Sequence, residues 1–176
     1  MTGVQTCALP IYGIPAGSSI LAVVEYNSVA SPPVLIQLTA TAPAIFSTSG
    51  IGTGQVAAFI VDPTTGKMFL NNDKNSGAKG QILIFYATGE GISGSIVPID
   101  GQIATTPASV VNPAVSVDIG GAPAEILYAG PSPGLVNGIL QINVKIPGSA
   151  TSGKAAPIVL RIGAGTSQAG ITMNLK

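Results

Sequence analysis

Two short motifs of the sequence could in principle carry chemistry. Residues 89–94 (Gly-Glu-Gly-Ile-Ser-Gly) match the G-x-G-x-x-G pattern of dinucleotide-binding loops, and residues 76–79 (Ser-Gly-Ala-Lys) match the S-x-x-K pattern of serine–lysine nucleophiles. A dinucleotide loop must open a helix whose N-terminus faces the pyrophosphate, whereas residues 95–101 have strand and turn character. A nucleophilic serine needs a desolvated lysine beside it on a helix, whereas residues 76–79 lie in a polar loop. We therefore interpret the two motifs as a glycine-rich turn and a solvated loop.

The residue types that build the commonest catalytic and metal sites are scarce. The chain contains no histidine, so a Ser-His-Asp triad is impossible, and its one cysteine is Cys7. A glycosidase pair would need two carboxylates facing each other across a cleft, and a β-sandwich with only seven Asp and Glu residues disfavours such a pair. We expect that the protein is not an enzyme and that it uses no cofactor.

A loop rich in side-chain oxygens is a candidate calcium site. Asn71, Asn72, Asp73 and Asn75 could all offer oxygen ligands. The loop lacks the alternating acidic ligands and the closing glutamate of a calcium-binding loop. We therefore favour a hydrated turn, and calcium binding by residues 71–77 stays open as the alternative.

Five side chains form a candidate surface for a ligand or partner: Tyr86, Tyr128, Gln141, Asn143 and Lys145. The tyrosines lie in expected strands or at their ends, and the other three project from one face of a single strand, where they could form a polar ladder. Sugar-binding sandwiches usually present an aromatic platform, often of tryptophan, and this chain has no tryptophan. Binding of an extracellular glycan or protein at this surface is the alternative to an ordinary solvated face.

The composition narrows the class of protein. Hydrophobic residues make up 46% of the chain, so a core can be buried, but charged residues make up only 8%, which argues against helical surfaces. Seven basic and seven acidic residues cancel, so we expect neither nucleic acid nor an anionic membrane surface as a partner. Since no apolar run approaches the ~18 residues of a membrane span, we expect no membrane insertion.

Short strand patterns recur between turn signals. In residues 140–146, Leu, Ile, Val and Ile alternate with Gln, Asn and Lys, which is typical of a half-buried strand, and the continuous apolar run 82–87 suits a central, doubly covered strand. Gly120-Gly121 predicts a hairpin turn between strands at 115–119 and 124–128, and Phe59, Phe69 and Phe85 are expected in the core. From Ala42 to Lys176 the seven or eight strands predict an all-β, antiparallel, Ig-like two-sheet sandwich.

The first 41 residues divide into two parts. For residues 1–11, one choice of codons from Thr2 onward resembles a sequencing-library adapter, so we expect a non-native segment that makes few contacts and a native chain that extends further upstream. Residues 12–41 supply only two strands. Their order of Ile-Pro, strand, Ser31, strand resembles the order around Ser167 near the end of the chain, so we expect a two-strand remnant of a preceding, similar module.

A family resemblance rests on a set of motifs in order: residues 42–46, 54–58, 85–91, 100–101, 119–124, 128–130, 133–134 and 141–147. Together they resemble an uncharacterised C-terminal module of large secreted proteins from soil bacteria, which is similar to Ig-like modules of the IPT/TIG type. The resemblance implies an extracellular or cell-surface location at the end of a longer polypeptide, and it implies no activity and no catalytic residues. The chain departs from the family pattern at 62–66 and 72–75.

These observations predict a non-catalytic structural, adhesion or spacer module at the C-terminal end of a large secreted or cell-surface bacterial protein. Its partners would be the neighbouring domains of the same polypeptide. The alternative function is a glycan- or ligand-binding accessory module of an extracellular enzyme, in which loops at one end of the sandwich bind the ligand.

Overall fold

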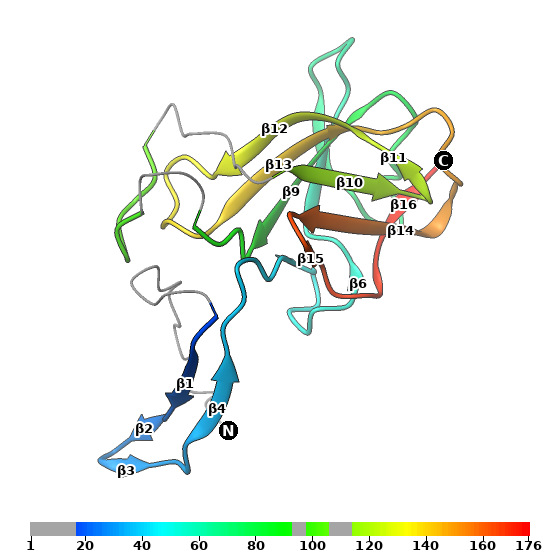
Figure 1. Ribbon diagram of the computed structural model, residues 1–176. Coiled ribbons are helices and arrows are strands. Elements are labelled where there is room, and N and C mark those ends of the chain that lie inside the picture. The colour runs from blue at the N-terminus through cyan, green and yellow to red at the C-terminus, as the bar shows by residue number, and fades with distance from the viewer. Residues whose placement is uncertain (1–16, 93–97, 106–113) are drawn as a thin grey trace.

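A computed structural model of the protein describes residues 17–92, 98–105 and 114–176 (Figure 1). The described residues form strands, turns and loops but no helix, so this part of the chain contains no helix that could cross a membrane. The adapter-like residues 1–11 and the end of the glycine motif, Ser93 and Gly94, lie outside the described residues.

Two six-stranded sheets pack against each other, as the sequence predicts. The first sheet contains β11 (Ala122–Pro123), β10 (Val115–Ile119), β14 (Gly153–Ile162), β16 (Ile171–Leu175), β6 (Gly54–Gln55) and, paired with β14, β15 (Gly165–Thr166). The second contains β12 (Glu125–Pro131), β13 (Leu140–Lys145), β9 (Ile82–Thr88), β7 (Ala58–Val61), β8 (Met68–Leu70) and, paired with β9, β5 (Ala44–Ile45).

The core lies between the sheets and follows the alternation of the strands. In β13, Leu140, Ile142 and Val144 are buried, whereas Lys145 is exposed, which confirms the predicted alternation. Phe85 of β9 is fully buried, and Phe69 packs against the core from its edge. The prediction was wrong for Phe59, which is half-buried because it lies on the outer face of β7.

The hairpin predicted at Gly120-Gly121 is present, but its second strand is shorter than expected. Residues 122–123 form β11, which pairs with β10 through Asp118 with Pro123 and Ile119 with Ala122. One further backbone bond, from the Ala124 N–H to the Val117 carbonyl at 2.8 Å, follows Pro123, and the chain then enters the second sheet as β12.

One pair of strands departs from the predicted antiparallel arrangement. β16 runs antiparallel to β14 but parallel to β6, with Ile171 beside Gly54 and Thr172 beside Gln55. No hairpin joins β6 to β16, so nothing local fixes their relative direction.

Residues 17–38 form a separate hairpin arm that extends away from the sandwich (Figure 1). Its strands are β1 (Ser19–Ala22), β2 (Glu25–Tyr26), β3 (Val29–Ala30) and β4 (Val34–Gln37). β1 pairs with β4 and β2 with β3, and among the described residues these strands have no other strand partners. The arm turns at Asn27 and Ser28, which both have positive φ (48° and 62°), as a two-residue hairpin turn of type I′ requires.

Candidate functional site

The five side chains of the candidate surface lie together on the outer face of the second sheet. In β9 and β13 every second residue points away from the core, and Tyr86, Gln141 and Asn143 occupy such positions. Three cross-strand rows on this face are Tyr86–Gln141–Gly130, Ile84–Asn143–Tyr128 and Ile82–Lys145–Glu125. The two tyrosines come from β9 and β12, the strands on either side of β13, and these two strands are about 10 Å apart.

Tyr128 is held along its own strand. Its hydroxyl donates a hydrogen bond to the carbonyl oxygen of Pro131 at 2.7 Å, so the ring runs past Gly130, which has no side chain to obstruct it. Burial raises the pKa of the Tyr128 hydroxyl above its usual value, and the negative charge of nearby Glu90 raises it further. The Tyr128 hydroxyl is therefore a protonated donor that is already engaged within the protein.

The polar side chains of the middle strand are also paired with each other. Gln141 Nε2 donates to Asn143 Oδ1 at 3.0 Å, along the strand. This bond occupies one donor of Gln141 and one acceptor of Asn143, so the two amides form a short ladder along the strand. The ladder satisfies part of its own hydrogen-bonding capacity without a ligand.

Sequence reasoning missed the apolar residues that extend this face. Phe59 pairs with Ile84 on one side and with Leu70 on the other, and Val61 pairs with Met68. Leu70 and Met68 are more than half exposed, and Phe59 is half-buried. In the sequence, only the alternation of Met68 and Leu70 around the inward-facing Phe69 could have indicated this apolar strip, and that pattern is only three residues long. The face thus combines two tyrosines, two amides and an apolar strip.

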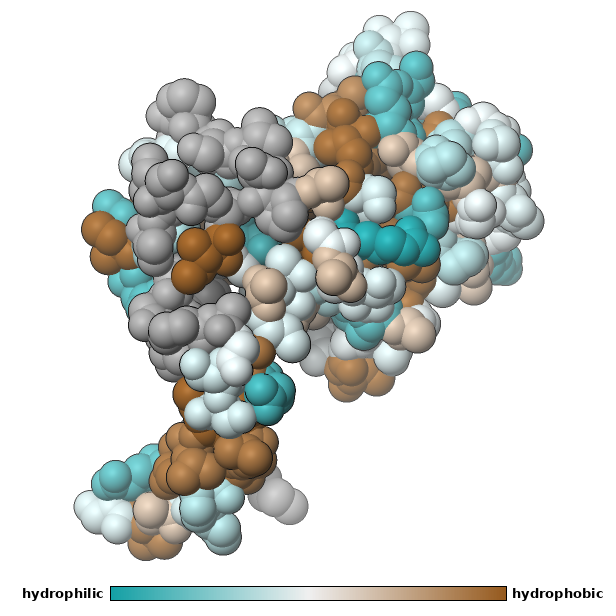
Figure 2. All heavy atoms as spheres, viewed as in Figure 1, coloured by the Kyte–Doolittle hydropathy of each residue, from teal (hydrophilic) through white to brown (hydrophobic). Residues whose placement is uncertain are grey.

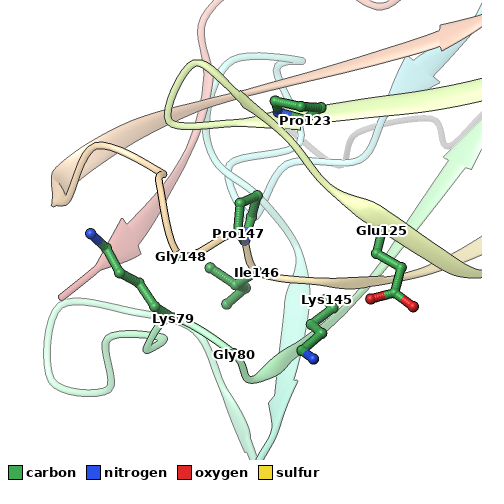
Figure 3. Close-up of a pocket in the computed structure, with 8 residues that line it drawn as sticks. All are labelled: Lys79, Gly80, Pro123, Glu125, Lys145, Ile146, Pro147 and Gly148. Atoms are coloured by element: carbon green, nitrogen blue, oxygen red, sulfur yellow. The ribbon is translucent and has the colours of Figure 1, made fainter.

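An open hollow of about 510 Å³ lies at the end of this sheet (Figure 3). It is lined by Lys79, Gly80, Pro123, Glu125, Lys145, Ile146, Pro147 and Gly148. Glu125 and Lys145 lie on one side and Lys79 on the other, with Ile146 and Pro147 between them (Figure 3). The hollow therefore has mixed charge and offers no concentration of one sign.

The 71–77 loop is built around a buried amide. Asn71 Oδ1 accepts a bond from the Asn174 N–H at 3.0 Å, and Asn71 Nδ2 donates to the Asn174 carbonyl at 2.8 Å, so the side chain pairs with β16 as a strand backbone would. Gln55 Nε2 also donates to Asn71 Oδ1 at 2.6 Å. The start of the loop is thus attached to the first sheet through the buried Asn71, whereas residues 72–75 form a largely exposed turn, as expected.

Two further side-chain oxygens of this loop are also engaged. Asn72 Oδ1 accepts bonds from the N–H groups of Lys74 and Asn75, both at 3.0 Å, and Asp73 Oδ1 lies 3.4 Å from Asn174 Nδ2. In the described part of the chain, no three His, Cys, Asp or Glu side chains come together as a metal site would require. The calcium alternative therefore gains no support from this geometry.

The two chemistry-like motifs have backbone roles in the described residues. Gly89 and Gly91 have positive φ (82° and 72°), and a side chain on either would overlap the carbonyl of Ala42 or Ala40. These glycines let the segment that follows the arm pass directly over the end of β9. Residues 76–79 lie in the loop between β8 and β9. Gly77 is buried, so the loop is not fully solvated, contrary to our expectation. Lys79 is exposed, so it is not the desolvated lysine that a serine–lysine nucleophile needs.

No family model matches the sequence, and comparison with curated proteins and with solved structures finds no similar protein. The structure therefore supports only the all-β fold with two main sheets that the resemblance implies.

Proposed function

We propose that this protein is a non-catalytic structural module of Ig-like type, which spaces or presents neighbouring domains of a large secreted or cell-surface protein. The low charge and the abundant strand and turn residues of the sequence support this role, as does the motif resemblance described above. The part that Gly89 and Gly91 of the glycine motif play in the backbone path also supports it.

The attachment of the arm to the sandwich is the observation that carries the proposal. Residues 39–43 connect the arm to the sandwich and run along the sandwich. The Ala42 N–H donates to the Gly89 carbonyl at 2.9 Å, and Thr41 Oγ1 donates to the Ile162 carbonyl at 2.8 Å. A Cβ on Gly165 would lie 2.6 Å from Thr41 Oγ1, so the segment fits closely against this turn. These contacts hold the segment that follows the arm against the sandwich, and this supports a junction of restricted motion, which a spacer requires.

The direct test is the distance between the arm and the sandwich in solution. Spin labels at Ala30→Cys and Ser116→Cys, in a Cys7→Ser background, lie on exposed positions of the arm and of the first sheet. We expect a narrow distance distribution in double electron–electron resonance, and a broader one when Thr41→Ala removes the bond to the Ile162 carbonyl. A broad distribution in the unmodified background would overturn the spacer role, because the junction would then act as a hinge.

Glycan binding is the second candidate function, and the outer face of the second sheet is the observation that favours it. Tyr86 and Tyr128 with the neighbouring apolar strip could form a platform for sugar rings. Depletion isotherms on insoluble cellulose, chitin and peptidoglycan separate the two functions. Under the spacer proposal retention does not saturate, whereas saturable retention that Tyr86→Ala abolishes and Tyr26→Ala on the arm preserves would establish the binding module.

A further inference from the structure

The arm exposes more apolar surface than a free hairpin can stably carry. Val24, Val34 and Leu35 are 61%, 62% and 67% exposed, and Tyr26 and Val29 are also exposed. Figure 2 shows hydrophobic residues gathered along the arm. A two-stranded hairpin alone is marginal in water, and contiguous exposed apolar patches generally mark a surface that another element covers.

The hairpin near the end of the chain has a turn of the same length as that of the arm. In the arm, Glu25 pairs with Ala30 and Tyr26 with Val29, around a two-residue turn. In β14 and β15, Arg161 pairs with Thr166 and Ile162 with Gly165, also around a two-residue turn. Each of these four positions in the second hairpin lies 136 residues after its counterpart in the arm.

A serine fastens both hairpins in the same way. In the arm, the Ser31 N–H donates to the Val24 carbonyl at 2.8 Å, and the Val24 N–H donates to Ser31 Oγ at 3.1 Å. In the second hairpin, the Ser167 N–H donates to the Leu160 carbonyl at 2.8 Å, and the Leu160 N–H donates to Ser167 Oγ at 3.1 Å. The weak repeat of the sequence is therefore a repeat of three-dimensional structure.

The register of the outer strands extends this correspondence. The arm pairs Ile20 with Ile36 and Leu21 with Leu35. The second hairpin pairs Ala156 with Met173 and Pro157 with Thr172, which are the equivalent positions once the arm is taken as one residue shorter after its serine. The two hairpins thus agree from the turn to the outer strands.

The second hairpin shows what covers such a face. Leu160, Ile162 and Met173 are fully buried, because they form the inner side of the first sheet and pack into the core shared with the second sheet. Their counterparts in the arm are Val24, Tyr26 and Ile36, and all three are exposed. The same face of the same hairpin is covered by a sheet in one place and uncovered in the other.

We infer that the arm is the closing hairpin of a second β-sandwich, and that its Val24–Tyr26–Ile36 face binds the apolar inner face of an open sandwich that lacks its own hairpin. A second copy of this chain does not fit as the occupant, because β14 and β16 already fill the equivalent place in its sandwich. The inference goes beyond the spacer role and does not depend on it, since it names the chemistry of a partner and not the stiffness of the junction.

A transplant within the full chain tests the inference, with the chain's own sandwich as the open-sandwich probe. Residues 22–31 replace residues 158–167, which are equal in number, and Arg161 is kept so that its ion pair with Asp118 survives. We expect a single cooperative urea transition at a lower midpoint than in the unmodified chain. Loss of the cooperative transition would overturn the equivalence of the two hairpins.

Two matched variants of the transplant test which face binds. Val24→Lys places a charge at the position of the buried Leu160, and Val23→Lys places it at the half-buried, outward-facing position of Val159, opposite Asp118. We expect Val24→Lys to abolish the cooperative transition and Val23→Lys to preserve it. Equal effects of the two substitutions would overturn the proposed binding face.

Sedimentation of the unmodified full chain tests the identity of the occupant. We expect a monomer across the accessible concentration range, because the arm fits an open sandwich and not a closed one. A dimer that Val24→Lys in the arm dissociates would overturn the proposal and make a second copy the occupant.

Discussion

Replacement of Asn71 by alanine removes a buried side-chain amide that links the loop after β8 to β16. The side chain of Asn71 accepts the N–H of Asn174 and donates to its carbonyl, across a sequence separation of 103 residues. The carbonyl of Asn174 keeps a second donor, the N–H of Gly77 at 2.9 Å, but the N–H of Asn174 is left without its acceptor. The alanine variant therefore leaves a buried backbone donor unsatisfied.

The magnitude follows from that inventory. An unsatisfied buried donor costs about 1–3 kcal/mol, and each further hydrogen bond that is lost contributes about 1 kcal/mol net. Asn71→Ala also removes three further bonds, to the carbonyls of Asn174 and Asn75 and from Gln55. It should therefore lower the free energy of unfolding by about 4–6 kcal/mol, which is a large share of the ~5–15 kcal/mol typical of a domain.

Urea denaturation followed by circular dichroism measures this loss, and Asn137→Ala is the matched control. Asn137 Nδ2 donates one bond, to the Ile99 carbonyl at 3.1 Å, in an exposed setting. The control should cost roughly 0.5 kcal/mol or less, as surface substitutions usually do. A loss at Asn71 no larger than that at Asn137 would refute the view that this amide substitutes for strand backbone.

Three further outcomes follow from particular contacts. Gly89→Ala should destabilise the protein by more than Gly66→Ala, because both glycines have positive φ but only at Gly89 would a side chain overlap the backbone. Urea melts of the two variants measure the difference in the free energy of unfolding. Equal losses would count against close packing at Gly89. Because burial raises the pKa of Tyr128, the folded state keeps this proton longer than the unfolded state does, so stability should fall as pH rises above about 10. Tyr128→Phe should reduce that alkaline loss in melts at increasing pH, and an unchanged pH profile would contradict it. Asp118→Asn should cost about 0–1 kcal/mol, because its 2.6 Å ion pair with Arg161 is partly exposed, and a larger loss in the same urea assay would mean that the pair is not a surface ion pair.

The local patterns of the sequence predicted the strands well where one face is clearly apolar. The alternation around Leu140, Ile142 and Val144 is a property of neighbouring residues, and the structure has it. The run 82–87 carried less information, because Ile82, Ile84 and Tyr86 form a half-buried outer row that pairs with Val61, Phe59 and Gln141 on other strands. Apolar residues on both faces of a strand do not distinguish double cover from an apolar outer face.

Contacts between distant residues account for what could not be predicted. Asn71 has the composition of a hydrated loop, and it is buried only because β16 passes beside it. Gly89 and Gly91 indicate a turn in the sequence, whereas their requirement for glycine comes from the path of residues 40–42. The five side chains of the candidate surface share one face because of the register of three strands, and their periodicity alone established only the three that lie on β13.

The position of β16 affects how the protein can be made. This strand consists of residues 171–175, yet it lies inside the first sheet between β14 and β6. During synthesis from the N-terminus, the apolar inner faces of the earlier strands stay uncovered until these residues emerge, whatever follows Lys176. Molecules released before residue 171 would expose open strand edges and an incomplete core, and both are recognised hazards for aggregation. Translation that stops early should therefore give material that is degraded or aggregated rather than a shorter working module.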